Sequence, residues 1–237
     1  MEISPLYEQL IYLEDKRVVT ADELRSVNPA RFAGVIGKME VMGLVERQQQ
    51  DGVKNYRLSE HGYRFLNSVL DTIHSSTLHW DRKWRLLWSS VPEKNRRTRD
   101  KLRKALEGLG LRPALRSLWV TPLDLKDRLI ETVEQLEIQE QTVIVEAEEG
   151  TGISTAALVK AWDFNKCRSL YEDFITQSDQ LIHDREQRES PNEIKKLIFQ
   201  YALILNNEPR LPIELLPKDW PKFRAQLQYK KLRRLLR

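Results

Sequence analysis

Eight residues between positions 28 and 57, seven polar side chains and one glycine, are of the kinds that read and hold DNA. Arg31 can donate two parallel hydrogen bonds to a guanine, whereas the ammonium group of Lys38 suits a phosphate. Gly34 lowers helix propensity by about 1 kcal/mol but lets a backbone come close. The predicted DNA-binding residues are Asn28, Arg31, Gly34, Lys38, Arg47, Gln49, Lys54 and Arg57. The alternative is a solvated helix face followed by a polar loop.

The segments around these residues predict the order helix, helix, helix, hairpin, helix, which is that of a winged helix-turn-helix. Thr20 followed by Glu23 is the pattern of a capping box at the start of the second helix. Asn28 and Pro29 are expected to cap and begin the third helix, which Gly43 ends. The expected elements are helices over 5–13, from 20, over 28–42 and over 59–73, with a hairpin over 44–58.

Charge is unevenly distributed along the 237 residues, although the net charge is only +4. Residues 80–116 hold 12 Lys/Arg against 4 Asp/Glu, and residues 218–237 hold 8 against 1. Residues 1–70 are slightly acidic, with 9 against 10, which limits how firmly this part can hold phosphates. Three further phosphate contacts are expected in the first basic run, at Arg96, Arg97 and Arg99, unless that run is only a solvated surface.

Several classes of protein are disfavoured by composition. No apolar run approaches the roughly 20 residues that cross a bilayer, and Glu2 and Glu8 stand where a signal peptide has cations, so we expect a cytoplasmic protein without a membrane partner. The single cysteine, Cys167, and the four histidines share no metal-ligand spacing. No nucleophile elbow or glycine-rich phosphate loop occurs, so we expect no enzyme, cofactor, catalytic residue or metal.

The rest of the chain divides at about residue 155. The pattern before it predicts strand, helix, strand, helix, strand over 83–147, which fits a ferredoxin-like sheet with helices on one face. After it, apolar residues recur at helical spacing only. The predicted class is therefore α+β, with a winged helix-turn-helix over 1–76, a ferredoxin-like α/β domain over 80–152 and a helical domain over 155–237.

Spaced tryptophans and prolines in the second and third segments resemble those of the PaaX family of bacterial repressors. The residues that carry the resemblance are Trp84-Arg85-Leu86-Leu87, Val91-Pro92-Glu93, Leu118-Trp119-Val120-Thr121-Pro122, Ala161-Trp162-Asp163, Glu208-Pro209-Arg210-Leu211-Pro212 and Leu215-Leu216-Pro217-Lys218-Asp219-Trp220-Pro221. The resemblance implies a winged helix, a middle domain like the small subunit of the CRISPR adaptation machinery, and a helical domain that responds to an effector. The segment 28–42 departs from the family's arginine-rich pattern, so the operator sequence is not carried over.

The resemblance implies a sequence-specific transcriptional regulator that represses a catabolic or metabolic operon. A small effector, of the acyl-coenzyme A type, would release it from its double-stranded DNA operator. Because operators are commonly two-fold symmetric, we expect a homodimer.

Two other functions have to be weighed against this one. A metal-dependent nuclease of the CRISPR adaptation type needs a carboxylate at the end of the first middle-domain strand, where this chain has Ser89 and Ser90, with Glu93 one turn later. A nonspecific DNA-bridging protein would use both basic runs and bind unrelated DNA sequences equally.

Overall fold

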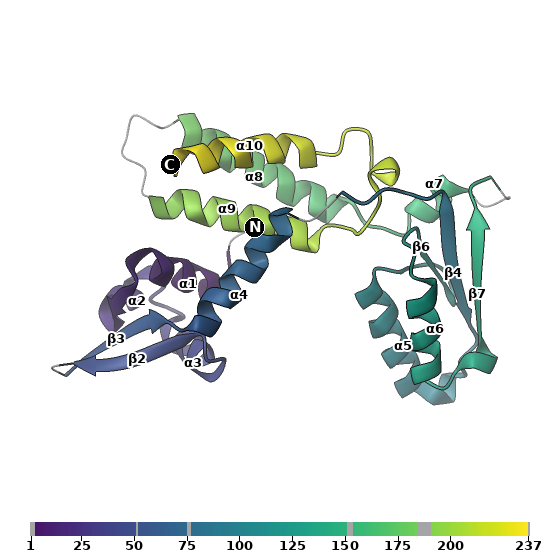
Figure 1. The fold of residues 1–237 in the computed structure, drawn as a ribbon, viewed down its shortest axis with the longest axis horizontal. Coiled ribbons are helices and arrows are strands. Elements are labelled where there is room, and N and C mark those ends of the chain that lie inside the picture. Colours follow the sequence, from purple (N-terminus) through teal and green to yellow (C-terminus); the bar gives the residue numbers. More distant parts are fainter. Residues whose placement is uncertain (1–2, 51, 75–76, 151–153, 184–190, 237) are drawn as a thin grey trace. The chain divides into compact units, whose positions relative to one another are not determined.

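The computed structural model describes residues 3–50, 52–74, 77–150, 154–183 and 191–236. About 60% of the chain is helical, and the two sheets are small and antiparallel, which confirms the α+β class. The chain forms two compact units (Figure 1). Unit 1 comprises Met1–Ser75, Cys167–Glu208 and Pro221–Arg237, and unit 2 comprises Ser76–Lys166 and Pro209–Trp220. No helix among the described residues is long and apolar enough to cross a membrane.

Unit 1 begins with helices and a hairpin in the order expected from the sequence. Its elements are α1 (Pro5–Lys16), β1 (Val18–Thr20), α2 (Ala21–Val27), α3 (Phe32–Val41), β2 (Val45–Gln50), β3 (Val53–Leu58), α4 (Glu60–Leu70), η1 (Asp71–His74), most of α8 (Asn165–His183), α9 (Pro191–Asn207) and α10 (Lys222–Leu235). The capping box is confirmed, because Glu23 N donates to Thr20 Oγ1 at 3.2 Å while Thr20 N donates to Glu23 Oε2 at 2.8 Å. Gly43 ends α3 as expected, with φ of 65°.

The expected start of the third helix is wrong. Asn28 is the C-cap of α2 rather than the N-cap of α3, and α3 begins only at Phe32. The side-chain Nδ2 of Asn28 donates to Glu8 Oε2 of α1 at 3.2 Å, and the backbone carbonyl of Asn28 accepts from Arg31 N at 3.3 Å. Because the Asn28 side chain is held by α1, residues 29–31 form a turn and Arg31 takes the N-cap position.

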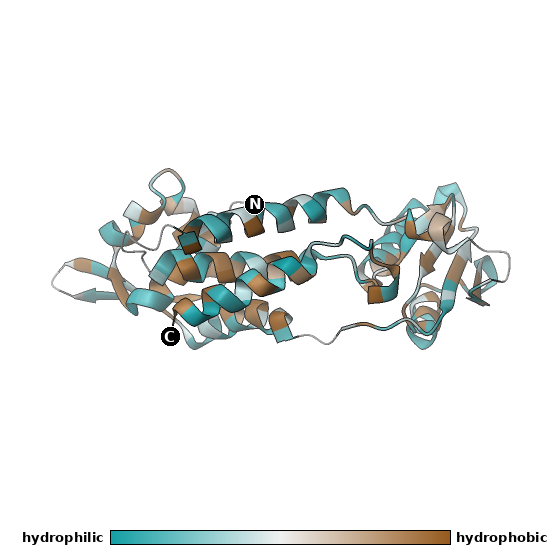
Figure 2. Cartoon of the chain, turned by 90° about the horizontal axis from the view of Figure 1, so that it is seen from above, coloured by the Kyte–Doolittle hydropathy of each residue, from teal (hydrophilic) through white to brown (hydrophobic). Residues whose placement is uncertain are grey.

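One hydrophobic core joins the N-terminal elements of unit 1 to α9. Leu10 and Leu13 of α1 and Met39 of α3 are fully buried in it, and Phe199 and Ala202 of α9 belong to the same cluster. At the edge of this core, Lys195 donates to Glu14 at 2.8 Å and to Asp15 at 3.0 Å. Hydrophobic and hydrophilic residues alternate around most helices, so each helix has an apolar side to bury (Figure 2).

The opposite side of α9 packs on the other two C-terminal helices. Tyr201 of α9 stacks on Phe174 of α8, with ring centroids 5.2 Å apart, and on Tyr229 of α10, with centroids 5.1 Å apart. Burial raises the pKa of the Tyr201 hydroxyl above its usual value. α9 is therefore buried on two sides, and it connects the α8–α10 layer to the N-terminal core.

Unit 2 is built on a four-stranded antiparallel sheet in the order β5-β6-β4-β7. Its elements are β4 (Lys83–Ser89), η2 (Glu93–Asn95), α5 (Arg96–Leu109), β5 (Arg112–Leu115), β6 (Leu118–Thr121), α6 (Lys126–Gln135), η3 (Gln139–Gln141), β7 (Thr142–Glu148), α7 (Thr155–Val159) and η4 (Ile213–Leu215). The sequence reasoning expected a single strand at 116–120 and missed β5. Pro113 obscured that strand, and a proline is tolerated there because β5 is an edge strand.

Both faces of this sheet are covered over part of their area. Leu87 packs against α5 and α6, in a cluster that includes Leu106 and Leu129. Trp84, on the opposite face, packs with Trp162 and with Leu211 of the proline-rich segment Pro209–Trp220. The proline-rich segment therefore covers one face of the sheet, although about fifty residues separate it from α7.

Candidate nucleic-acid interface

The exposed side of α3 carries three of the predicted DNA-binding residues. Arg31, Gly34 and Lys38 follow one another at helical spacing, and all three are exposed. No carboxylate in the described part of the chain forms an ion pair with Arg31 or Lys38, so both cations are available to a phosphate or a base. Val41 continues the same stripe and is 90% exposed. The sequence reasoning missed Val41, although its position three residues after Lys38 could have identified it; a valine here can contact a thymine methyl group.

The hairpin register separates the four predicted residues of β2 and β3. Gln49 pairs with Lys54, and Arg47 pairs with Tyr56, so Arg47, Gln49 and Lys54 lie on one face of the hairpin. Arg57 pairs with Glu46 and lies on the opposite face.

An ion pair links one hairpin face to α3, and a second ion pair neutralises Arg57 on the other face. Arg47 Nη1 is 3.6 Å from Glu40 Oε1 of α3, so the face with Arg47, Gln49 and Lys54 adjoins α3. On the other face, Arg57 Nη2 is 2.6 Å from Glu46 Oε2 and Arg57 Nε is 2.8 Å from the same oxygen. The structure therefore brings Arg47 to α3 and places Gln49 and Lys54 on the same hairpin face as Arg47. Arg57 lies apart from them.

Asn28 lies beside Arg31 but has its amide engaged. It is half-buried, and its Nδ2 atom bonds Glu8. A base contact would have to use its second N–H or its side-chain carbonyl oxygen, or break that bond. Arg31 and Lys38 are consequently stronger candidates for the reading residues than Asn28.

A second basic surface surrounds an open hollow of about 660 Å³ in unit 2. Arg96 and Arg99 line it, together with Arg103 of the same basic run and with Arg116, which the sequence reasoning missed. Arg103 lies one helical turn after Arg99, a spacing visible in the sequence, whereas the β5–β6 turn that places Arg116 there was not expected. Arg97 is exposed but does not line this hollow.

Acidic groups in this hollow only partly balance the arginines. Asp100 is 3.9 Å from both Arg96 and Arg103, and Glu93 is 3.8 Å from Arg116. Arg99 has no ion-pair partner in the ranges that the structure describes. This surface therefore keeps a net positive charge that suits a phosphate.

Two family profiles match consecutive parts of the chain. The profile of the "PaaX protein central Cas2-like domain" matches residues 77–159, and that of the "PaaX-like protein C-terminal domain" matches residues 162–237. The chain belongs to the PaaX family. Membership in the PaaX family points to a PaaX-like transcriptional regulator.

Comparison with solved structures shows a similar fold and no more than that. A solved structure of "Uncharacterized protein Rv0674 from Mycobacterium tuberculosis" is similar to this PaaX-family chain with a TM-score of 0.53 and 18% sequence identity. The similarity covers 96% of this chain and 86% of that one. No curated protein matches the chain.

The end of β4 in this PaaX-family protein lacks a metal-binding arrangement of side chains. Ser89 N donates to Ser117 O at 3.0 Å, and Ser90 Oγ donates to Gln141 O at 3.3 Å, so both serines bind neighbouring backbone. Among the described residues, no group of three or more His, Cys, Asp or Glu side chains could hold a metal ion. These donors do not fit the divalent cation that the nuclease alternative requires.

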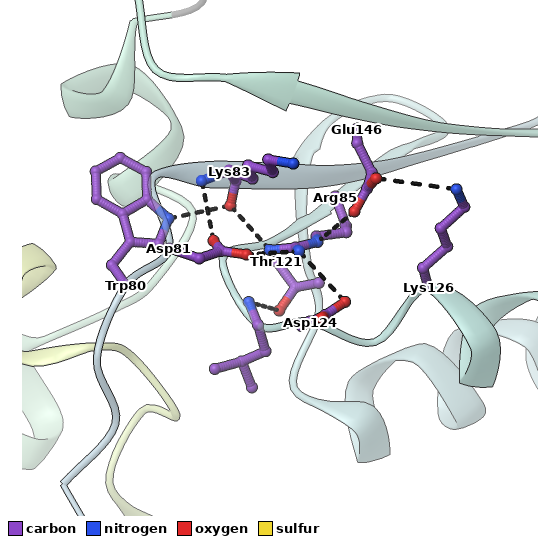
Figure 3. Close-up of polar contacts among 9 residues, drawn as sticks. Trp80, Asp81, Lys83, Arg85, Thr121, Asp124, Lys126 and Glu146 are labelled. Atoms are coloured by element: carbon purple, nitrogen blue, oxygen red, sulfur yellow. Dashed lines mark hydrogen bonds and ion pairs between the residues drawn. The ribbon is translucent and has the colours of Figure 1, made fainter.

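Carboxylates of unit 2 instead surround a buried arginine (Figure 3). Arg85 is 3% exposed, and its guanidinium is 2.6 Å from Asp81, 3.2 Å from Asp124 and 3.0 Å from Glu146. Burial opposes the charge on Arg85, but the hydrogen bond and charge of Asp81 outweigh it and raise its pKa. Lys126 lies 3.9 Å from Glu146 at the edge of this cluster. The cluster links β4 and β7 to the segment before α6, so its role is to stabilise the fold of unit 2.

Proposed function

We propose that this chain is a sequence-specific DNA-binding repressor that reads an operator with α3 of a winged helix-turn-helix. The observation that carries the proposal is the surface formed by α3 and one hairpin face. Arg31 and Lys38 are exposed there without ion-pair partners in the described ranges, Arg47 pairs with Glu40 of α3, and Gln49 and Lys54 share the hairpin face of Arg47. In such a domain α3 is the recognition helix in the major groove, and the β2–β3 wing follows the backbone.

In this proposal unit 2 is a ferredoxin-like domain. Its elements run β4-α5-β5-β6-α6-β7 around the sheet order β5-β6-β4-β7, which is the arrangement of a β-α-β-β-α-β fold. We assign it an accessory role in DNA binding through Arg96 and Arg99. The helical C-terminal part would receive an effector, of the acyl-coenzyme A type, that releases the protein from the operator of a catabolic or metabolic operon. The repressor would act as a homodimer, because one recognition helix reads only half of a two-fold operator.

The test begins with genome-wide mapping of bound sites, followed by binding measurements on the sites found. Replacing Arg31 by alanine is expected to weaken specific binding by about 10- to 100-fold, since a bidentate base contact is worth about 1–3 kcal/mol. Lys38→Ala is expected to weaken binding to all sequences similarly. Equal affinity of the wild type for unrelated DNA would instead favour the nonspecific DNA-bridging function.

Arg57→Ala is the matched control for this experiment. Arg57 lies on the hairpin face turned away from Arg47, and Glu46 already neutralises it. We expect its replacement to change specific affinity less than twofold. A loss as large as that of Arg31→Ala would mean that the other hairpin face contacts the DNA.

Salt dependence tests the accessory surface in unit 2. Each phosphate contact contributes about 0.9 to the slope of log affinity against log salt concentration. Arg99→Ala should therefore reduce the slope by about 0.9 for each protomer whose Arg99 contacts a phosphate, with little change in sequence preference. Arg128 is an exposed residue of α6, and Arg128→Ala should leave the slope unchanged. An unchanged slope for Arg99→Ala would remove unit 2 from the DNA interface.

A further inference from the structure

A hollow of about 530 Å³ lies within unit 1, where the turn between α2 and α3 meets α1, α8 and α9. Each of these elements contributes to its lining, and Arg31 is one of the lining residues. We call it the Arg31 hollow. Its volume falls in the range of sites that hold small organic ligands. The position is notable because Arg31 is also the proposed reading residue of α3.

Most polar groups around the Arg31 hollow are already paired. Glu193 Oε1 accepts a hydrogen bond from Lys196 at 3.1 Å, and Glu8 Oε2 accepts one from Asn28 at 3.2 Å. The charges of Glu193 and Lys196 cancel locally, whereas Glu8 keeps its negative charge.

Besides the exposed Gln177, two donors of the lining remain without a partner within the ranges that the structure describes. One is the Arg31 guanidinium, and the other is the side-chain amide nitrogen of Gln200 on α9. Gln200 is only 3% exposed. A buried donor without an acceptor carries a desolvation cost that a ligand oxygen would relieve. These two donors are therefore available to a hydrogen-bond acceptor of a ligand that binds in the hollow.

The surroundings define the chemistry of that acceptor. A guanidinium pairs best with a planar carboxylate, to which it can donate two parallel bonds. A dianion would be repelled more strongly by the carboxylate of Glu8, so a single negative charge fits better. The remaining lining includes the apolar side chains of Ile3, Val27 and Leu197. These suit an apolar body attached to the carboxylate.

We propose that the Arg31 hollow binds a small monocarboxylate with an apolar body, and that this ligand competes with DNA for Arg31. The second half of this inference rests on the proposed function, because it requires Arg31 to read DNA. Binding linkage then makes the ligand and the DNA lower each other's affinity by the same factor. The largest reduction equals the contribution of Arg31 itself, as measured by Arg31→Ala.

Calorimetry on the full chain without DNA tests the hollow by itself, with benzoate and hexanoate as probes and acetate as the small comparison. We expect saturable binding of benzoate or hexanoate with Kd on the order of 1 mM or tighter, and weaker binding of acetate. Arg31→Ala and Gln200→Leu should each weaken the probe at least about fivefold. Lys38→Ala, outside the hollow, should not change it.

Two results would overturn the ligand site. One is the absence of saturable binding by both larger probes, and the other is unchanged binding in both Arg31→Ala and Gln200→Leu. Gln200→Met, which keeps an unbranched side chain of similar length, replaces Gln200→Leu if circular dichroism shows that the leucine variant is misfolded.

Measurements with DNA, at ionic strength held constant with sodium chloride, then test the competition. Saturating probe should reduce wild-type DNA affinity by the factor that Arg31→Ala loses. Gln200→Leu should keep its DNA affinity and lose the response, whereas Lys38→Ala should bind DNA weakly and keep the response. Wild-type DNA affinity that stays constant at saturating probe would disprove the competition. If the wild type bound no DNA, the proposed function would fail, while calorimetry would still decide the ligand site.

Discussion

Replacing Arg85 by leucine is expected to destabilise unit 2 by about 2–3 kcal/mol. The variant leaves Asp81, Asp124 and Glu146 facing one another without their shared cation. Losing one partner of a buried ion pair costs about 3–5 kcal/mol. We expect a somewhat smaller loss because the three carboxylate side chains are 42%, 77% and 31% exposed and can regain water.

Tryptophan fluorescence measures this loss selectively, because all six tryptophans lie in unit 2 and all seven tyrosines lie in unit 1. Urea unfolding of the full chain, followed by this fluorescence, should give the free energy of unfolding of unit 2. Arg82→Leu is the matched control. Arg82 is 81% exposed and pairs with Glu149 at 3.6 Å, so its loss should cost under about 1 kcal/mol. Equal effects of the two substitutions would refute a structural role for the Arg85 cluster.

The effect of Arg85→Leu should also depend on pH. Burial opposes the charge on Asp81, but its hydrogen bonds with Arg85 and Lys83 hold its pKa below the ordinary value. A carboxyl whose folded pKa is lowered contributes stability above its unfolded pKa, and loses it as pH falls through the folded value. The difference between wild type and variant should therefore be full at pH 7 and shrink below about pH 4.

Gly62→Ala is expected to destabilise unit 1 by about 2 kcal/mol, although alanine is the better helix former. A Cβ atom at position 62 would lie 2.1 Å from the carbonyl oxygen of Leu44. That oxygen is backbone and accepts a hydrogen bond from Ser59 N at 3.0 Å, so it cannot move aside without breaking the junction between α3 and α4. The clash outweighs the gain of about 1 kcal/mol in helix propensity.

Gly37→Ala provides the comparison within the same unit. Gly37 lies inside α3, and nothing stands within 4 Å of the Cβ that alanine would add. This substitution should raise the free energy of unfolding by about 0.5–1 kcal/mol. Urea unfolding followed by far-ultraviolet circular dichroism would measure both variants, with tryptophan fluorescence reporting unit 2 in the same sample. A stabilised Gly62→Ala variant would show that α4 can move away from Leu44.

Local elements of this protein were predictable where neighbouring residues decide them. The Thr20–Glu23 capping box needs only atoms within four residues, and it forms as expected. The hairpin over 44–58 follows from two β-prone runs around a polar turn, and its strands are β2 and β3. The start of α3 could not be predicted in this way, because Glu8, twenty residues earlier, holds Asn28.

The composition of the candidate interface was partly predictable and its geometry was not. Arg31, Lys38 and Lys54 were identifiable from residue type and helical or strand position. The separation of Arg57 from Arg47 depends on the pairing register of β2 and β3, which assigns alternate residues to opposite faces. Arg116 lines the basic hollow of unit 2 because the β5–β6 turn places it there, and this turn was not expected from the sequence.

The amino-acid sequence by itself determined the PaaX-family character of this protein, its helix and hairpin order, and the residues that we propose hold DNA. These features depend on residue type and short-range spacing, which the chain carries without folding. Tertiary structure alone decided that α9 shares a core with the N-terminal helices, and that Arg31 stands between the proposed reading surface of α3 and a hollow lined by α8 and α9. The physical reason is that these groups lie more than 120 residues apart in sequence, and only burial of their apolar sides brings them together.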